Sequence, residues 1–192
     1  MGVYRTLPSA MKKINLVIVS SLALSACSHV TPQYGASIEN VDALRTLGSN
    51  GVKLSVAPFA TFEPGLASIS CRAAGPVIPA GDQTYEQYIQ QAIVGELKLS
   101  STYSEASPVK LDGHLDYITF NSNIGAGKWQ IDMTFSGPGV TPFTINTLYP
   151  FSTNFVADIA CNQVANALPP AVQELVAKLI AHPSFKQLLV QK

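Results

Sequence analysis

Apolar and polar residues alternate most regularly in the middle of the chain. From Trp129 to Phe135 every second residue is apolar and the residues between them are polar, as in a strand with one buried face. The neighbouring segments have the same period, although the earlier one changes phase at Ile118, which indicates a bulge or twist. Turn-like segments separate them, so we expect an antiparallel meander. Its three strands are predicted at 109–120, 129–136 and 143–151.

An earlier strand is predicted where Val52, Leu54 and Val56 alternate with polar residues, and Pro58 ends it. The segment that follows, 59–83, contains several glycines and prolines and is predicted to be an irregular loop. A loop of this length is uncommon in a compact domain, so we expect a crosslink to hold it in place.

Two helices are predicted before the meander. Thr84 and Gln87 fit the capping-box pattern, and from Tyr85 onward apolar residues recur with the period of a helix. This apolar stripe could be a cofactor-binding face, but such stripes far more often pack into a core. A shorter helix is predicted between Ser37, which can cap its start, and Gly48, which can end it.

The C-terminal part of the chain also has the helical period of apolar residues. Proline is tolerated in the first turn of a helix, so Pro169-Pro170 is expected to end one helix, 155–168, and to begin the next. His182-Pro183 then ends the second helix, and Ser184 can cap a last short turn.

The predicted order of elements is therefore β-α-β-β-β-α-α. A single antiparallel or mixed sheet of about four strands, with the helices packed on one face, buries all of the apolar stripes. We expect an α+β fold, and we assign this domain to residues 51–192.

The start of the chain has the pattern of a secretory signal. Met11-Lys12-Lys13 precedes an uncharged apolar stretch, 14–26, which is too short to span a bilayer as a stable helix. Residues 1–10 fit no part of a signal, so Met11 is a candidate for the true start. The stretch ends in Leu24-Ser25-Ala26-Cys27, which resembles the lipobox of bacterial lipoproteins.

This resemblance implies a lipid anchor. In that family residues equivalent to 1–26 are removed as the signal peptide, and the cysteine, here Cys27, carries diacylglycerol on its sulfur and an acyl chain such as palmitate on its amine. Ser28, rather than aspartate, implies the outer membrane, with the domain on its periplasmic face or displayed at the surface. Residues 27–50 then form the lipidated N-terminus and a tether, polar over 28–36, with a short helix. The alternative is an ordinary buried cysteine after a cleaved signal or a short anchor.

Loss of the signal changes the charge. The whole chain has 12 Lys+Arg and 12 Asp+Glu, and the signal contains Arg5, Lys12 and Lys13 but no acidic residue, so the mature chain has a net charge of −3. A nucleic-acid-binding protein needs a basic surface to neutralise phosphates. We therefore expect no nucleic-acid partner.

Lipidation of Cys27 leaves Cys71 and Cys161 as a pair in an oxidising compartment, and we expect a disulfide between them. Closing a loop of this length stabilises a protein by roughly 4–5 kcal/mol in the chain-entropy model. Two free buried thiols are the alternative. A metal site is less expected, because no histidine or second cysteine lies at ligand spacing from either residue.

The residues with catalytic potential are few. Asp112, His114 and Asp116 alternate along a predicted strand and could act as a general base or as metal ligands, but a solvated polar face is the favoured interpretation, because no nucleophile or further ligand is evident. The chain has no Gly-x-Ser-x-Gly motif, and Gly125-Ala126-Gly127-Lys128 lacks the other residues of a phosphate loop. We expect no catalytic residues, no metal and no cofactor, and hence no enzyme.

The order of elements over roughly residues 50–182 is similar to that of small envelope lipoproteins. Those proteins activate cell-wall synthases or form rings and channels for export of curli or exopolysaccharide. The resemblance implies a non-catalytic accessory or assembly module that binds an envelope protein or self-associates. A binder of a small lipid or glycan is the second hypothesis, and a cell-wall hydrolase is the third.

Overall fold

Three long antiparallel strands form the centre of the fold. In the computed structural model, which describes residues 1–2 and 28–190, they are β6 (Lys110–Asn121), β7 (Gly127–Gly137) and β8 (Val140–Phe151). β7 pairs with both of the others, so the predicted meander is confirmed. The predicted irregularity is also confirmed, because the register shifts between Leu115 and Tyr117. This shift lets Leu115 and Ile118 both face the core.

Two short strands extend this sheet beyond β6. β2 (Ser55–Val56) and β3 (Ala60–Thr61) both pair with β6 in parallel. The sheet therefore has five strands of mixed orientation, in the order β2-β6-β7-β8 with β3 also on β6. The predicted strand before Pro58 is present as β2, although it is shorter than the alternation of its residues indicated.

A second sheet has three strands, β1 (His29–Val30), β5 (Pro76–Ile78) and β4 (Ile69–Ser70). β1 is parallel to β5, and β4 is antiparallel to it. The predicted single sheet is therefore wrong, while the α+β class is confirmed. Strands of two or three residues are too short to show an alternation of apolar and polar positions, so the sequence contained no periodic signal for them.

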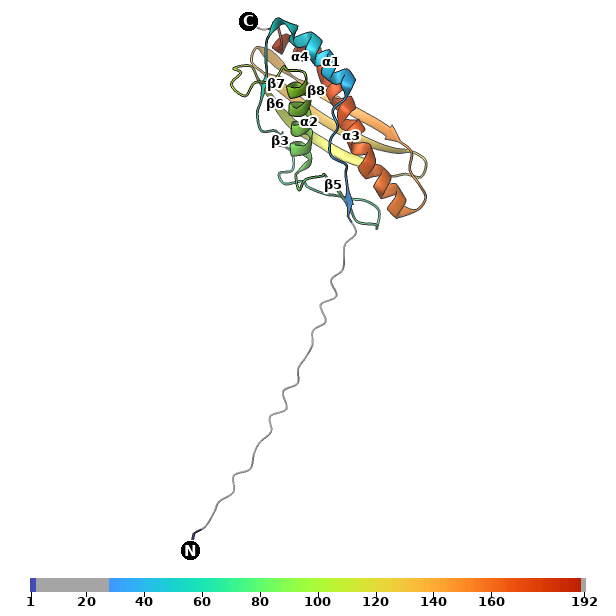
Figure 1. The fold of residues 1–192 in the computed structure, drawn as a ribbon. Coiled ribbons are helices and arrows are strands. Elements are labelled where there is room, and N and C mark those ends of the chain that lie inside the picture. The colour runs from blue at the N-terminus through green and yellow to red at the C-terminus, as the bar shows by residue number, and fades with distance from the viewer. Residues whose placement is uncertain (3–27, 191–192) are drawn as a thin grey trace.

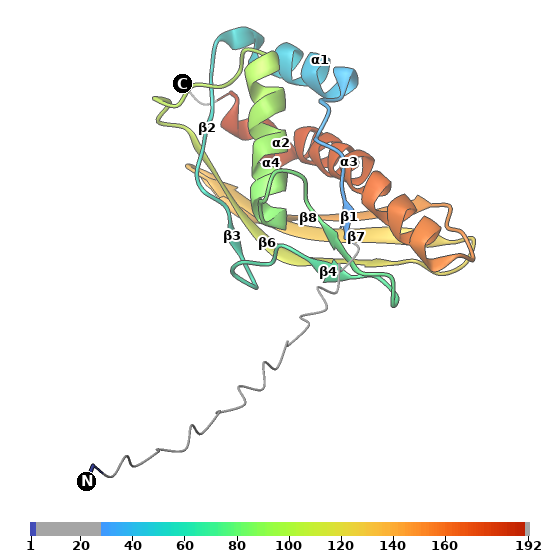
Figure 2. The ribbon, with the colours of Figure 1, turned by 60° about the horizontal axis from the view of Figure 1, so that its bottom comes forward.

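Helices cover one face of the five-stranded sheet, as predicted (Figure 2). α2 (Tyr85–Leu99) begins with the expected capping box at Thr84 and Gln87, and α3 (Ala157–Ala181) lies beside it. α1 (Ile38–Leu47), capped by Ser37, packs on both helices at one end of the domain, whereas the chain enters at the other end, near β1 (Figure 1). The opposite face of the sheet is open to solvent, and its residues alternate with the buried ones.

α3 continues without interruption through Pro169 and Pro170, so the predicted break is wrong. A proline inside a helix cannot donate to the carbonyl four residues earlier and costs about 3 kcal/mol. Burial outweighs this penalty, because both halves of α3 place their apolar stripes in the same core. The fully buried residues on the two sides of the prolines include Val164, Leu168, Val172 and Leu175.

The remaining elements close the end of the domain that carries α1. η1 (Gly48–Asn50) follows α1, and α4 (Pro183–Leu188) follows α3. The cap of α4 is His182, whose Nδ1 accepts from the Ser184 N–H, rather than Ser184 itself. Across the described residues, no helix combines the length and the hydrophobicity that crossing a membrane requires.

Candidate functional site

The chain joins the fold directly after the predicted lipidation site. Cys27 and the signal peptide before it lie outside the described residues, but β1 begins only two residues after Cys27 and pairs with β5. Thr31 continues this pairing, since its N–H donates to the Ile78 carbonyl at 2.9 Å. The prediction of a free tether over 28–36 is therefore corrected at its start, where the backbone belongs to a sheet.

His29 fixes this segment to the rest of the domain. The sequence placed it in the tether, yet its side chain is only 3% exposed. Its Nε2 lies 3.1 Å from the Ala74 carbonyl, and its Nδ1 lies 3.1 Å from Asn162 Oδ1 in α3. Asp158, one turn earlier in α3, lies 4.0 Å from the ring. Each ring nitrogen thus faces an oxygen of another segment, which explains why a histidine is accommodated in a buried position.

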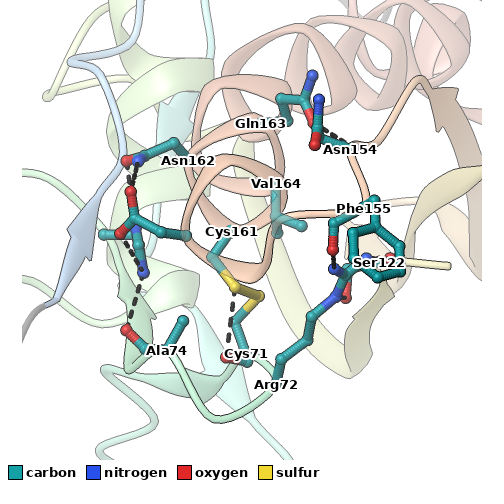
Figure 3. Close-up of a disulfide and its surroundings, with 12 residues drawn as sticks. Cys71, Arg72, Ala74, Ser122, Asn154, Phe155, Cys161, Asn162, Gln163 and Val164 are labelled. Carbon is teal, nitrogen blue, oxygen red and sulfur yellow. Dashed lines mark hydrogen bonds and ion pairs between the residues drawn. A yellow bond between two sulfur atoms is a disulfide. The ribbon is translucent and has the colours of Figure 1, made fainter. Parts of the chain in front are cut away.

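The disulfide lies near Ala74 and Asn162, the two residues that His29 contacts (Figure 3). Cys71, directly after β4, is bonded to Cys161 in the second turn of α3, 90 positions later. Both residues are fully buried, and the Cys161 sulfur also lies 3.3 Å from the Cys71 carbonyl. The bond therefore joins the small sheet, which contains β1, to the helix that packs on the large sheet.

Arg72 makes a further set of connections on the exposed side of the disulfide (Figure 3). Its Nε donates to Ser122 Oγ at 3.1 Å, and its Nη1 donates to the Phe155 carbonyl at 3.0 Å. The guanidinium also donates to the Ser122 carbonyl. Because these partners lie at the end of β6 and just before α3, one side chain ties three segments together. The sequence did not single out Arg72, since its partners become neighbours only in the fold.

Glu96 on α2 is the most deeply buried acidic residue of the described chain. Its Oε1 accepts from the hydroxyl of Tyr34 at 2.6 Å, the N–H of Ser37 at 3.0 Å and the side-chain amide of Asn40 at 3.3 Å. Its Oε2 has no hydrogen-bond partner among the described residues. Burial raises the pKa of Glu96, and the three donors oppose that shift. Burial, and then the contact with Glu96, also raise the pKa of Tyr34. The cluster fastens the start of α1 to α2.

α1 lies at the end of the domain opposite β1 (Figure 1), and its residues line surface grooves. The largest of the described grooves runs between α1 and α3, has a volume of about 410 Å³ and is open to solvent. Another, of about 350 Å³, lies between α1 and the end of α2 and includes the exposed side chains of Ile38 and Leu99. Apolar side chains predominate in the lining of the first groove, which consists of Asn40, Ala43, Thr46, Leu47, Ala177, Ile180, Ala181 and Lys186.

The residues with catalytic potential lie elsewhere, on the open face of the large sheet. His114 Nδ1 is 2.7 Å from Asp116 Oδ1, and the hydroxyl of Thr134 donates to the other carboxylate oxygen at 2.7 Å. Asp112 is outside this group and lies opposite Ser136 on β7. His114 and Asp116 are partly exposed and do not line the grooves around α1. No cluster of three metal-ligating side chains occurs within the described residues.

No family model matches the chain, and no curated protein matches it either. Among solved structures, the protein XCC0632 from Xanthomonas campestris, of the DUF330 family, is similar in fold with a TM-score of 0.47 and 14% sequence identity. The similarity covers 68% of this chain and 84% of that one. A similarity of this kind does not extend to site residues or to an activity, because one fold can carry many functions.

Proposed function

We propose that this protein is a lipid-anchored envelope lipoprotein that binds another envelope protein and catalyses no reaction itself. Lipid on Cys27 holds it at the periplasmic face of the outer membrane, since the lipobox precedes Ser28. The pairing of β1 with β5 supports this arrangement, because a domain that starts two residues after its anchor works at the membrane surface.

The observation that carries the partner-binding function is the apolar groove between α1 and α3. Ala43, Leu47 and Ala177 line it with small and apolar side chains, and its volume of about 410 Å³ suits a few inserted side chains of a partner. The groove lies at the end of the domain that is far from β1 (Figure 1). A partner that spans the space beyond the membrane can therefore reach it while the anchor stays inserted.

Photo-crosslinking in intact cells tests this function. A benzophenone amino acid is placed at Ala43 or at Ala177, both of them exposed in the groove, and at Asp112 on the open sheet face as the matched control. We expect the two groove positions to give one discrete crosslinked species that Asp112 does not give, and mass spectrometry then identifies it. A crosslink to a second copy of this chain assigns the groove to self-association. A crosslink only to lipid or glycan supports the second hypothesis instead, and no crosslink at either groove position contradicts protein binding there.

Cys27→Ser tests the anchor separately. The variant is expected to lose the lipid and either to become soluble in the periplasm or to keep its signal peptide, as read by membrane fractionation and intact mass. A variant that is still cleaved and still fractionates with lipid would show that Cys27 is not the anchor.

A further inference from the structure

Besides Val30 in β1 itself, four further large apolar side chains are exposed at the end of the domain that contains β1. Phe155 and Val156 precede α3, Ile159 lies in its first turn, and Ile124 is at the tip of the β6–β7 turn. Phe155 is 77% exposed and Ile124 is 64% exposed. We call these four residues the anchor-end patch. Single exposed apolar residues are ordinary, but a contiguous cluster of them marks a surface that contacts a protein partner or a membrane.

Hydrogen bonds show that the segments of this patch are neighbours. The Gly125 N–H donates to the Thr153 carbonyl at 3.1 Å, which brings the β6–β7 turn beside the residues that lead to Phe155. Arg72 joins the same two segments, because it donates to both Ser122 and the Phe155 carbonyl. The segments that carry the four side chains are therefore neighbours in the fold.

The patch also lies next to the point where the chain enters the fold. His29 contacts Asn162 and lies 4.0 Å from Asp158, and these residues flank Ile159 in α3. In the sequence only Ser28 separates His29 from the predicted lipidation site. A lipid on Cys27 therefore brings the start of α3 to the surface of the bilayer.

We propose that the anchor-end patch inserts into the surface of the same bilayer that holds the lipid on Cys27. This proposal rests on the lipid anchor of the proposed function and adds a second contact to it. Phenylalanine, isoleucine and valine partition into the boundary between headgroups and acyl chains, and the lipid keeps them there at high local concentration. Among the neighbouring charges, Arg72 and Lys128 are exposed cations that can face phosphate groups, and Asp158 is the exposed acid beside His29.

Insertion of the patch fixes the orientation of the domain. A lipid alone permits rotation about Cys27, whereas a lipid and an inserted protein surface together define one face toward the membrane. With the start of α3 in the bilayer, α1 and the grooves that its residues line lie toward the other end of the domain (Figure 2). The partner-binding groove is then presented toward the periplasm, independently of any partner.

Tryptophan scanning with lipid-borne quenchers tests the proposal. The full lipidated chain is reconstituted in vesicles of phosphatidylethanolamine and phosphatidylglycerol that contain brominated acyl chains. Phe155→Trp and Ile159→Trp report on the patch. Leu99→Trp is the control, because Leu99 lies at the α1 end and its exposed fraction, 61%, lies between those of Phe155 and Ile159. Wild-type protein provides the signal of Trp129, which is fully buried. We expect bromine to quench the fluorescence of the patch tryptophans at least about twofold and to leave Leu99→Trp at the wild-type level.

Flotation of the same vesicles separates the two ways in which the proposal can fail. If the protein floats with the vesicles but Phe155→Trp is quenched no more than Leu99→Trp, the anchor holds and the inserted patch is overturned. The same conclusion follows if Phe155→Trp is quenched by acrylamide from the water and not by bromine. If the protein does not float at all, the lipid anchor is absent, and both the anchor and the insertion that depends on it are overturned.

Discussion

His29 and Asn162 are 133 positions apart in the sequence, and the Nδ1 atom of His29 lies 3.1 Å from the Oδ1 atom of Asn162. This contact joins β1 to the helix that packs on the large sheet. It places the start of the fold beside the start of α3. The position of the predicted lipid relative to the domain depends on it.

Replacing His29 by alanine is expected to release β1. The variant loses the contacts of the buried ring with Ala74 and Asn162, which leaves polar groups of both residues without their partner and costs about 1–3 kcal/mol. The free energy of unfolding from urea titration measures the loss, and hydrogen exchange at the Thr31 N–H reports the local opening. His114→Ala, on the open sheet face, should change stability by less than about 0.5 kcal/mol. Equal effects of the two variants would show that His29 does not hold β1.

Removal of the disulfide is expected to weaken the join between the two sheets. The double variant Cys71→Ala, Cys161→Ala should lose about 2–5 kcal/mol, because the unfolded chain gains the freedom that the crosslink removes. Thermal unfolding with and without dithiothreitol measures this loss. The reductant should lower the midpoint of the wild type and leave that of the double variant unchanged. A wild-type midpoint that does not respond to reductant would indicate two free thiols.

Glu96 is expected to make stability depend on pH. Burial raises the pKa of its carboxyl above the ordinary value of 4.5 in the folded state. Folding therefore favours the protonated carboxyl. The stability that results is fully present below the pKa of the unfolded state and is lost as pH rises through the pKa of the folded state. Glu96→Gln keeps the acceptor for Tyr34 and cannot ionise, so its stability should fall less from about pH 4 to about pH 8. Urea titrations across this range compare the two proteins.

Glu39→Gln is the matched control for the direction in which stability changes with pH. Hydrogen bonds to its own backbone and to Ser37 lower the pKa of Glu39, which is exposed, so its contribution is lost as pH falls rather than as it rises. The Glu39→Gln variant should therefore still lose stability as pH rises, as the wild type does. If Glu96→Gln shows the same profile as the wild type, the buried carboxyl is not the group responsible.

Pro170→Ala is expected to stabilise α3. The substitution restores an N–H that can donate to the Asn166 carbonyl, and it removes the penalty of about 3 kcal/mol for a proline inside a helix. Alanine also gives the unfolded chain more conformational freedom, which offsets about 1 kcal/mol of this gain in stability. The urea midpoint should rise. Pro183→Ala is the control, because Pro183 is in the first turn of α4, where proline is favoured and the gain should be absent. A lower midpoint for Pro170→Ala would show that the fold requires the altered turn.

Much of the fold could be predicted because its signals are local. The alternation from Trp129 to Phe135 gave the central strand, and the capping box at Thr84 gave the start of α2. Local rules failed where tertiary contacts outweighed them. Pro169-Pro170 predicted a helix break, but burial of the apolar stripe on both sides keeps α3 continuous. The polar residues of 28–36 predicted a tether, but His29 and Thr31 find partners that are distant in sequence.

By itself, the sequence predicted a lipobox at Cys27 and a pair of cysteines that remains after it, and it determined the periodic elements of the α+β domain. Only the tertiary structure decided that β1 begins two residues after the predicted lipidation site, that Glu96 is buried, and that large apolar side chains are exposed at the start of α3 and in the β6–β7 turn. The physical reason is the range of the interactions. Periodicity and capping act between residues a few positions apart, whereas these features arise where segments up to 133 positions apart meet.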